Sequence, residues 1–431
     1  MPNPDIIRLI LTVFAIVFLV GMLIRPFYGL LSYLLIMMVR PGVFYPVLKT
    51  LRIELLAGVL VLVVITLSTD RLKRLQIKED PIIKWMFILF GVMLVSMLQA
   101  MDFKYSWDWM WEFAKVLAFF IMIVTLPDSK KDVQLFLWVF GIATCMMSYD
   151  AIYNFFTGNV IERIGDVGTD YAVTSGGMGA GHVALANITL QAMPFLWYLG
   201  VINKNLTLKL GGAILFLISL YAVIVSGSRG GFVGLLSLLI CLSVFSRRKA
   251  LMALLGVALL FSIPLVAGSK YMAYMETVKK LGSADAGLSS SSRISGLRNG
   301  IEMMIKRPAL GVGPGCYPIA RKAWFGWGLW AHNHYGELMG DLGVIGTVVW
   351  FMFLYSYWKP SWRIIKQTGI ENEYQNLFTA VIVATIVRLV VGMGSHSVYI
   401  FFWYMMAGVI VSTLRTEGQN QPQELKASLA K

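Results

Sequence analysis

Charged residues, cysteines and histidines are scarce in this sequence. Only 14% of its 431 residues are charged, whereas 58% are hydrophobic and the mean hydropathy is +0.71, which excludes a soluble globular protein with an ordinary charged surface. The three cysteines, Cys145, Cys241 and Cys316, are too few and too scattered for a disulfide framework. Four histidines without a third ligand at metal spacing, and no Asp-x-Asp motif in the predicted external loops, predict no metal or other cofactor.

Long apolar runs are abundant instead. Blocks of about 15 to 20 residues recur, each long enough to cross most or all of a hydrocarbon layer of about 30 Å. Because backbone groups in lipid must be hydrogen-bonded internally, we predict an all-α, polytopic integral membrane protein of about twelve or thirteen transmembrane helices. The predicted spans are 6–24, 27–39, 53–68, 85–98, 113–126, 133–156, 184–199, 210–226, 231–245, 250–267, 341–357, 374–391 and 398–413.

The first two blocks leave two alternatives. Only Arg25 and Pro26 separate them, and the second block is short, so they form either a tight hairpin or one broken span. No small-residue cleavage site follows the first block, which predicts a retained helix rather than a removable signal peptide.

Basic residues in the short loops predict the orientation, because Lys and Arg are retained on the cytoplasmic side. The strongest cluster runs from Arg71 to Lys78, and placing it inside also brings four later basic loops inside. Those loops contain Lys130/Lys131, Lys204/Lys209, Arg247–Lys249 and Lys359–Lys366. The opposite, non-cytoplasmic face then receives the segments 102–112, 157–183, 226–231 and 268–340 and a turn around His396.

The long external loop divides the predicted single membrane domain. N-terminal helices occupy 1–267, the loop 268–340, C-terminal helices 341–413 and a cytoplasmic tail 414–431. Between Lys270 and Lys322 the loop carries nine Lys or Arg residues against only three acidic residues. The positive-inside rule does not explain this excess on an external loop. An anionic ligand would explain it, and anionic lipid headgroups are the alternative.

A short turn from Ser226 to Gly231, with the sequence Ser-Gly-Ser-Arg-Gly-Gly, lies between two predicted spans. Glycines permit a sharp reversal, so we expect Arg229 at the outer membrane boundary, directed into protein or a wet cavity. Its guanidinium is a planar fork of donors suited to a phosphate or diphosphate. The alternative is an arginine that snorkels to lipid headgroups.

A helix followed by a glycine-rich turn is predicted in the second half of the long loop. Serines at 289–292 are typical of a helix start, and Pro308 ends the helix. Arg293 and Arg298 lie off its apolar stripe. The stripe consists of Ile294, Leu297, Ile301 and Met304/Ile305. The turn at 311–315 offers amides that can form an anion-binding nest, whereas an amphipathic helix on the membrane surface, closed by a flexible turn, is the alternative.

The segment from Ala331 to Glu337 connects the long loop to the next span. On a helix, His332 and Tyr335 share one face while Glu337 points elsewhere, so one face can line a cavity. Histidine titrates near neutral pH, and His332 can therefore act as a general base or donate a hydrogen bond to phosphate. A purely structural histidine is the alternative.

Two charged residues fall within predicted spans. Asp150 lies in the outer half of one span and Arg388 near the outer end of a late one. Charges are costly in lipid and are usually functional or paired. We predict substrate-binding roles for both, and an ion pair between them is the alternative.

Five short motifs follow one another in the second half of the chain. They are the Ser-x-Ser-Arg-Gly turn, the Ser-Ser-Arg opening of the loop helix, Arg307–Gly315, Ala331-His332-Asn333 and Asp341–Gly346. In this order they resemble the O-antigen ligase and Wzy polymerase family over about residues 210–350. The resemblance implies a bacterial inner-membrane glycosyltransferase of GT-C type, with a periplasmic active site and an undecaprenyl diphosphate-linked glycan as donor.

The family's residues for diphosphate recognition and catalysis match Arg229, Arg293 and His332 of this sequence. A lipid diphosphate leaving group needs cationic donors rather than protonation, and the acceptor hydroxyl needs only a weak base. The family's ligases are thought to work without a metal. The predicted catalytic residues are His332, Arg229 and Arg293, and the predicted substrate-binding residues are Arg298, Arg388, Asn333, Tyr335 and Asp150.

The acceptor is left open by the sequence. A glycan, a lipid or a protein hydroxyl would each suit the family, so an O-antigen ligase, a polysaccharide polymerase and a protein O-oligosaccharyltransferase are all alternatives. The turns at Arg25-Pro26 and Arg40-Pro41 resemble those of family relatives found in exopolysaccharide gene clusters. This resemblance slightly disfavours a lipid A-core ligase. A transporter or flippase of lipid-linked glycans is the other class, but the chain lacks detectable internal symmetry. Membrane lipids, but no nucleic acid, are expected as further partners.

Overall fold

The computed structural model describes residues 3–157, 160–162, 170–172, 181–246, 249–254, 256–258, 288–367 and 372–418. The chain forms two compact units. Unit 1 comprises Met1–Leu67, Leu126–Lys280 and Trp362–Val391, and unit 2 comprises Ser68–Thr125, Leu281–Ser361 and Gly392–Lys431. Each unit therefore collects segments that are far apart in the sequence.

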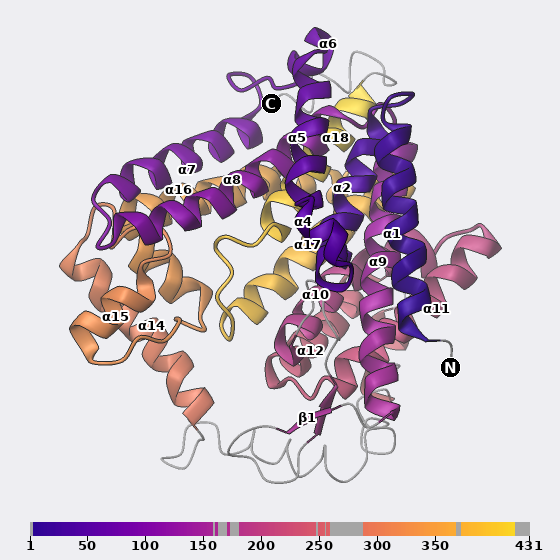
Figure 1. Cartoon of the computed structure of the whole chain (residues 1–431). Coiled ribbons are helices and arrows are strands. Elements are labelled where there is room, and N and C mark those ends of the chain that lie inside the picture. The colour runs from indigo at the N-terminus through magenta and orange to yellow at the C-terminus, as the bar shows by residue number, and fades with distance from the viewer. Residues whose placement is uncertain are drawn as a thin grey trace. The chain divides into compact units, whose positions relative to one another are not determined.

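Unit 1 is built mainly from helices (Figure 1). Its elements are α1 (Pro4–Gly21), α2 (Phe27–Val39), α3 (Pro41–Phe44), α4 (Pro46–Thr50), α5 (Ile53–Thr66), α9 (Lys130–Phe156), β1 (Val160–Glu162), β2 (Asp170–Ala172), α10 (His182–Phe195), the π-helical turn η1 (Leu196–Val201), α11 (Leu206–Val225), α12 (Arg229–Phe245) and α17 (Asn372–Gly392). The two strands form a short antiparallel pair with Val160 opposite Ala172.

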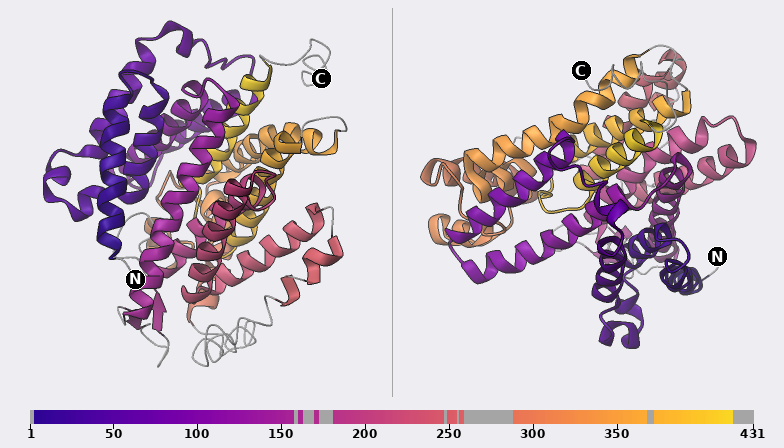
Figure 2. Two further views of the ribbon diagram at one scale, coloured as in Figure 1. Left: turned by 90° about the vertical axis from the view of Figure 1, so that its right-hand side faces the viewer. Right: turned by 90° about the horizontal axis from the view of Figure 1, so that it is seen from above.

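Unit 2 is helical in its described part, and its α7 and α8 lie side by side (Figure 2). Its elements are α6 (Thr69–Leu72), α7 (Pro81–Leu98), α8 (Phe103–Thr125), α14 (Leu288–Lys306), α15 (Tyr317–Phe325), α16 (His334–Lys366) and α18 (Phe402–Gly418). The last residues of α16, from Trp362, belong to unit 1.

The helices confirm the predicted all-α, polytopic membrane fold, apart from the short strand pair. Each predicted span within the described residues overlaps a helix, whereas the span at 250–267 lies largely outside them. In the described part of the chain, seven helices are long and apolar enough to cross a membrane. They are α1, α7, α9, α10 with η1, α11, α16 and α17. The total of twelve or thirteen spans stays a prediction.

The first two helices form a hairpin. The hydroxyl of Ser32 in α2 donates a hydrogen bond to the carbonyl of Ala15 in α1 at 2.7 Å. Arg25, in the connecting turn, donates to both carboxylate oxygens of Asp132 at 2.7 and 2.8 Å. Asp132 lies in the first turn of α9, where a carboxylate also stabilises the helix dipole. Of the two alternatives for the first blocks, the structure shows the hairpin.

A buried ion pair connects the other end of α1 to α9. Arg8 pairs with Asp150, and both side chains are almost fully buried. The guanidinium also lies 4.4 Å from the centroid of the Phe44 ring. A charge within the membrane is tolerated when it is paired, and the structure gives Asp150 such a partner on α1, whereas the sequence pointed only to Arg388.

A cavity of about 1080 Å³ lies in unit 1. It is lined by the ends of helices that, according to the basic loops, are predicted on one side of the membrane. Its lining includes Gln134 near the start of α9, Leu208 near the start of α11, Phe245 at the end of α12 and Gln375 near the start of α17. These ends therefore lie together. Which side of the membrane they occupy stays a prediction.

In unit 2, arginines gather at the end of α8. Arg74 donates to the carbonyl of Thr125 at 2.7 Å, and Arg415 of α18 donates to the carbonyl of Val124. The last carbonyls of a helix lack intrahelical partners and carry partial negative charge, so arginine is a favourable cap there. The basic loop that starts at Arg71 thus lies beside the end of α8.

Candidate functional site

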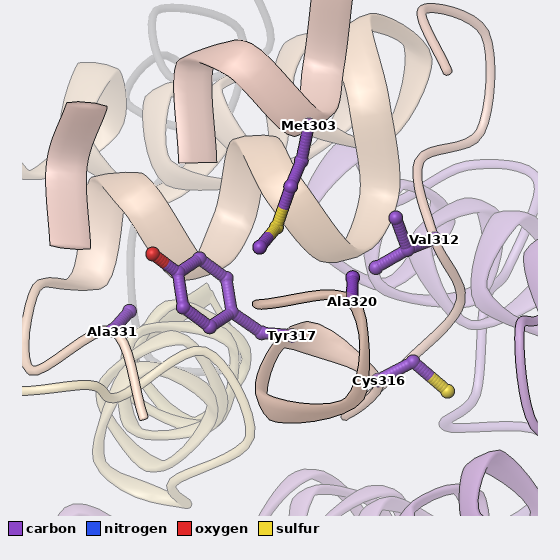
Figure 3. Packing of buried hydrophobic residues seen from close by; sticks show 6 residues of the cluster. All are labelled: Met303, Val312, Cys316, Tyr317, Ala320 and Ala331. Atoms are coloured by element: carbon purple, nitrogen blue, oxygen red, sulfur yellow. The ribbon is translucent and has the colours of Figure 1, made fainter. Parts of the chain in front are cut away.

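A small hydrophobic core in unit 2 joins α14, α15 and the segment before α16 (Figure 3). It consists of Met303, Val312, Cys316, Tyr317, Ala320 and Ala331, all fully buried. Burial raises the pKa of the Cys316 thiol to about 12, as expected for a packing residue. The Tyr317 ring points toward Ala331, the residue before His332, so this core fixes the backbone that leads into His332.

The predicted loop helix is present as α14, and part of its predicted apolar stripe is exposed. Ile294 and Ile305 of the predicted apolar stripe are 68% and 70% exposed. Glycines face inward instead, because the backbones approach too closely for a side chain. A Cβ atom on Gly296 would lie 1.8 Å from the carbonyl oxygen of Ala331, and one on Gly300 would lie 2.2 Å from a backbone oxygen of α16.

The glycine-rich turn that follows α14 does not form the predicted anion-binding nest. The amides of Val312 and Gly313 donate to carbonyls of α16 at 2.9 and 3.0 Å. The amide of Gly315 donates to the carboxylate of Asp341 at 2.9 Å. An acidic side chain of the protein therefore takes the place that an external anion would need, and the turn serves to anchor α16.

His332 lies just before α16 rather than on it, which corrects the prediction of a shared helical face. Its φ is 45°, a left-handed conformation that is rare outside glycine. Asn333 holds it there: the Asn333 side chain accepts from the amide of Gly336 at 3.0 Å and donates to the carbonyl of Met393 at 3.1 Å. His332 itself is partly exposed. His332 therefore has a strained backbone and lies directly before the capped first turn of α16.

The electrostatic surroundings keep His332 neutral. Burial, followed by the charges of His396, Arg293 and Arg321, lowers the pKa of His332 to about 4. At neutral pH the imidazole therefore has a free lone pair and can accept a proton. Arg293, predicted as catalytic, belongs to the same cluster, because its charge acts on His332.

Arg321 is the main residue of this cluster that the sequence did not single out. It is fully buried on α15, and it donates to the Ser295 hydroxyl at 2.8 Å and to the Trp330 carbonyl at 3.0 Å. Its guanidinium lies 4.5 Å from the centroid of the Trp327 ring. Arg321 thus joins α14 to the segment that carries His332. In the sequence it was only one of nine basic residues in the loop.

Arg229 lies in unit 1, at the first position of α12. Ser228 caps this helix by accepting from the amide of Gly231 at 3.1 Å. Arg229 is 8% exposed, which does not fit the alternative of an arginine reaching out to headgroups. A Cβ atom on Gly234 would lie 2.5 Å from Leu190 of α10, so glycines let α12 pack closely on its neighbour.

Residues 214–351 match the family model described as O-antigen ligase. Over these residues, called the matched segment below, the chain is similar to the O-antigen ligase family. No sequence among the curated proteins compared matches the chain. The matched segment begins in α11 of unit 1 and ends in α16 of unit 2.

The matched segment includes six of the eight predicted site residues. These are Arg229, Arg293, Arg298, His332, Asn333 and Tyr335. Asp150 and Arg388 lie outside the matched segment. Arg388 is fully buried on α17 of unit 1.

Arg298 and Tyr335, two further predicted site residues in the matched segment, differ in how exposed they are. The Arg298 side chain is 80% exposed and pairs with Glu302 at 3.0 Å, one helical turn along α14. Tyr335 is partly exposed, with its ring 5.4 Å from that of His334. In the described part of the chain, no group of three or more His, Cys, Asp or Glu side chains comes together as a metal site would require.

Proposed function

We propose that this protein is a glycosyltransferase of the bacterial inner membrane. It would move a glycan from an undecaprenyl diphosphate-linked donor to an acceptor hydroxyl at the periplasmic face. The match to the O-antigen ligase family and the helices that are long and apolar enough to cross a membrane support this proposal. The observation that carries it is the placement of His332, which Asn333 holds in a left-handed conformation directly before α16, where burial and the charge of Arg293 lower its pKa.

The proposed reaction is a single displacement at the anomeric carbon of the donor. The acceptor hydroxyl gives its proton to His332, and its oxygen forms a bond to the anomeric carbon. The bond from that carbon to the diphosphate oxygen breaks, and undecaprenyl diphosphate leaves with the electron pair. Arg293 stabilises the leaving charge through forked contacts. The arriving diphosphate also raises the proton affinity of His332, since a nearby negative charge favours the imidazolium.

The other predicted residues take supporting roles in this proposal. The resemblance implies diphosphate recognition for Arg229, and Arg388 is proposed as a substrate-binding residue. Asn333 positions His332, because both of its amide atoms are bonded to backbone. Asp150 pairs with Arg8, and its role in substrate binding stays a prediction. For Tyr335 and Arg298, the proposal is peripheral contact with the donor.

The function is tested with membranes of the source bacterium from which the gene has been deleted, since these contain both donor and acceptor. Purified full-length protein in detergent is added, and lipids are analysed by mass spectrometry. The expected result is loss of glycan from undecaprenyl diphosphate and appearance of free undecaprenyl diphosphate. The fraction that gains glycan, whether lipid A-core, polysaccharide or protein, identifies the acceptor. A donor that keeps its glycan would indicate a transporter instead.

The low pKa of His332 predicts the acid limb of the pH profile. A base works when deprotonated, so with a pKa of about 4 in the free enzyme, kcat/KM should hold down to roughly pH 5, where an ordinary histidine of pKa about 6.5 would be mostly protonated. Arg293→Gln removes a positive neighbour and should move the limb to higher pH. Lys322→Ala, on the exposed side of α15, is the control and should leave it in place. A wild-type limb near pH 6.5 would contradict the assignment.

A further inference from the structure

A continuous row of aromatic rings starts at His332. The His332 and His396 ring centroids lie 5.5 Å apart, and His396 stacks on Trp330 at 5.3 Å with an interplanar angle of 20°. Trp330 in turn meets Trp109 of α8 edge to face, at 5.1 Å and 66°. These four rings, all within unit 2 and all partly exposed, are called the ring row below.

The inner end of the ring row is anchored in the core of unit 2. Trp109 packs on Tyr399, with centroids 5.3 Å apart. The hydroxyl of Tyr399 donates to the Asp341 carboxylate at 2.8 Å and accepts from the amide of Gly315 at 3.0 Å. A Cβ atom on Gly315 would lie 2.2 Å from the Trp109 indole, so only glycine lets this ring reach its position.

Hydrogen bonds also hold the backbone at Trp330, within the ring row, and at His332, its outer end. The carbonyl of Trp330 accepts the 3.0 Å hydrogen bond from the buried Arg321. The backbone of His332 is fixed by the cap on α16. Rings fixed at both ends lose little conformational freedom on binding, so this arrangement is suited to recognition.

The position of the ring row beside His332 indicates which class of ligand it binds. The indole rings of Trp330 and Trp109 have apolar faces, and such faces pack well against the C–H face of a pyranose. Under the proposed function, the hydroxyl that His332 deprotonates belongs to the acceptor. The sugar that carries this hydroxyl must therefore lie across the rings next to His332.

We propose that Trp330 and His396 form the binding platform for the acceptor sugar, with Trp109 as its support. The platform determines which pyranose presents its hydroxyl to His332. The identification of this sugar as part of the acceptor rests on the proposed function, whereas binding of a sugar can be observed without turnover.

Sugar binding is tested by saturation-transfer NMR on the full-length protein in detergent, with methyl pyranosides of glucose, galactose, mannose and N-acetylglucosamine as probes. In the wild type, saturation should reach the ring C–H protons of at least one probe. Trp330→Ala should lower this transfer several-fold, and Trp330→Phe should restore most of it, because a ring face is kept. Trp111→Ala is the matched control: Trp111 lies two residues from Trp109 on α8 but is 54% exposed.

Turnover separates the platform from a merely structural role. With the membrane assay above, Trp330→Ala should raise the KM for acceptor by roughly 3- to 10-fold, as expected from the loss of one aromatic contact, while the KM for donor stays within twofold. No saturation in the wild type, equal saturation in Trp330→Ala and Trp111→Ala, or a rise in the donor KM instead would overturn the proposal. Probe binding without any glycan transfer by the wild type would instead overturn the proposed function.

Discussion

Replacement of His332 by alanine should lower kcat by about 10²- to 10⁴-fold, the usual contribution of a general base. Donor binding should remain largely intact, because an interaction used in the transition state need not hold the ground state. Transfer is measured as release of undecaprenyl diphosphate, and donor binding is measured separately with the same lipid. Expression and a monodisperse elution profile in detergent establish first that each variant folds.

Arginine variants complete the comparison. Arg293→Lys keeps the charge but loses the planar fork, so it should reduce activity despite its conservative appearance. Arg229→Ala should weaken donor binding as well as turnover. Lys322→Ala, which removes a charge from the exposed side of α15, should do neither. If His332→Ala retained full transfer, or lost donor binding as completely as Arg229→Ala, His332 would be a phosphate ligand or a structural residue rather than the base.

Helix positions could be predicted because they depend on local composition. A run of apolar residues in lipid has no stable alternative to a helix, and the helices therefore overlap the predicted spans. The hairpin of α1 and α2 was one of two alternatives, since Arg25 and Pro26 allow both. Asp132 decides between them through its bonds to Arg25, and a contact over this distance in the chain leaves no local signal.

The face through which α14 packs could not be predicted from hydrophobic period. The period marked isoleucines such as Ile294, which are exposed. Burial is decided instead by backbone contact of Gly296 with Ala331, a residue of another segment. The glycine-rich turn misled for a similar reason: its amides do bind a carboxylate, but one supplied by Asp341 of the same chain.

Only some residues of the site could be predicted from the sequence. His332 and Arg293 stood in recognisable motifs, and the structure brings both into one electrostatic cluster. Arg321, Trp330 and His396 stood in none. Their roles come from ring contacts and hydrogen bonds that join α8, α15 and the segment after α17, and no spacing along the chain encodes such contacts.

Gly296→Ala should disable the enzyme although it adds one methyl group. The new Cβ would lie 1.8 Å from the carbonyl oxygen of Ala331, so α14 must move away from the segment that carries His332. Arg293 lies one turn earlier on the same helix and would move with it. Misplacement of catalytic groups by about 1 Å can cost on the order of 10²-fold in rate, and overpacking costs about 1–3 kcal/mol in stability.

Gly91→Ala is the matched control for this prediction. Gly91 lies in α7, also in unit 2, and a Cβ atom there would meet nothing within 4 Å. Alanine favours a helix interior over glycine by roughly 0.5–1 kcal/mol, so this variant should keep full activity and unfold at the same or a higher temperature. Thermal unfolding in detergent and glycan transfer are measured for both variants. Equal behaviour of the two would show that α14 does not depend on the contact between Gly296 and Ala331, and would remove the physical link between that helix and His332.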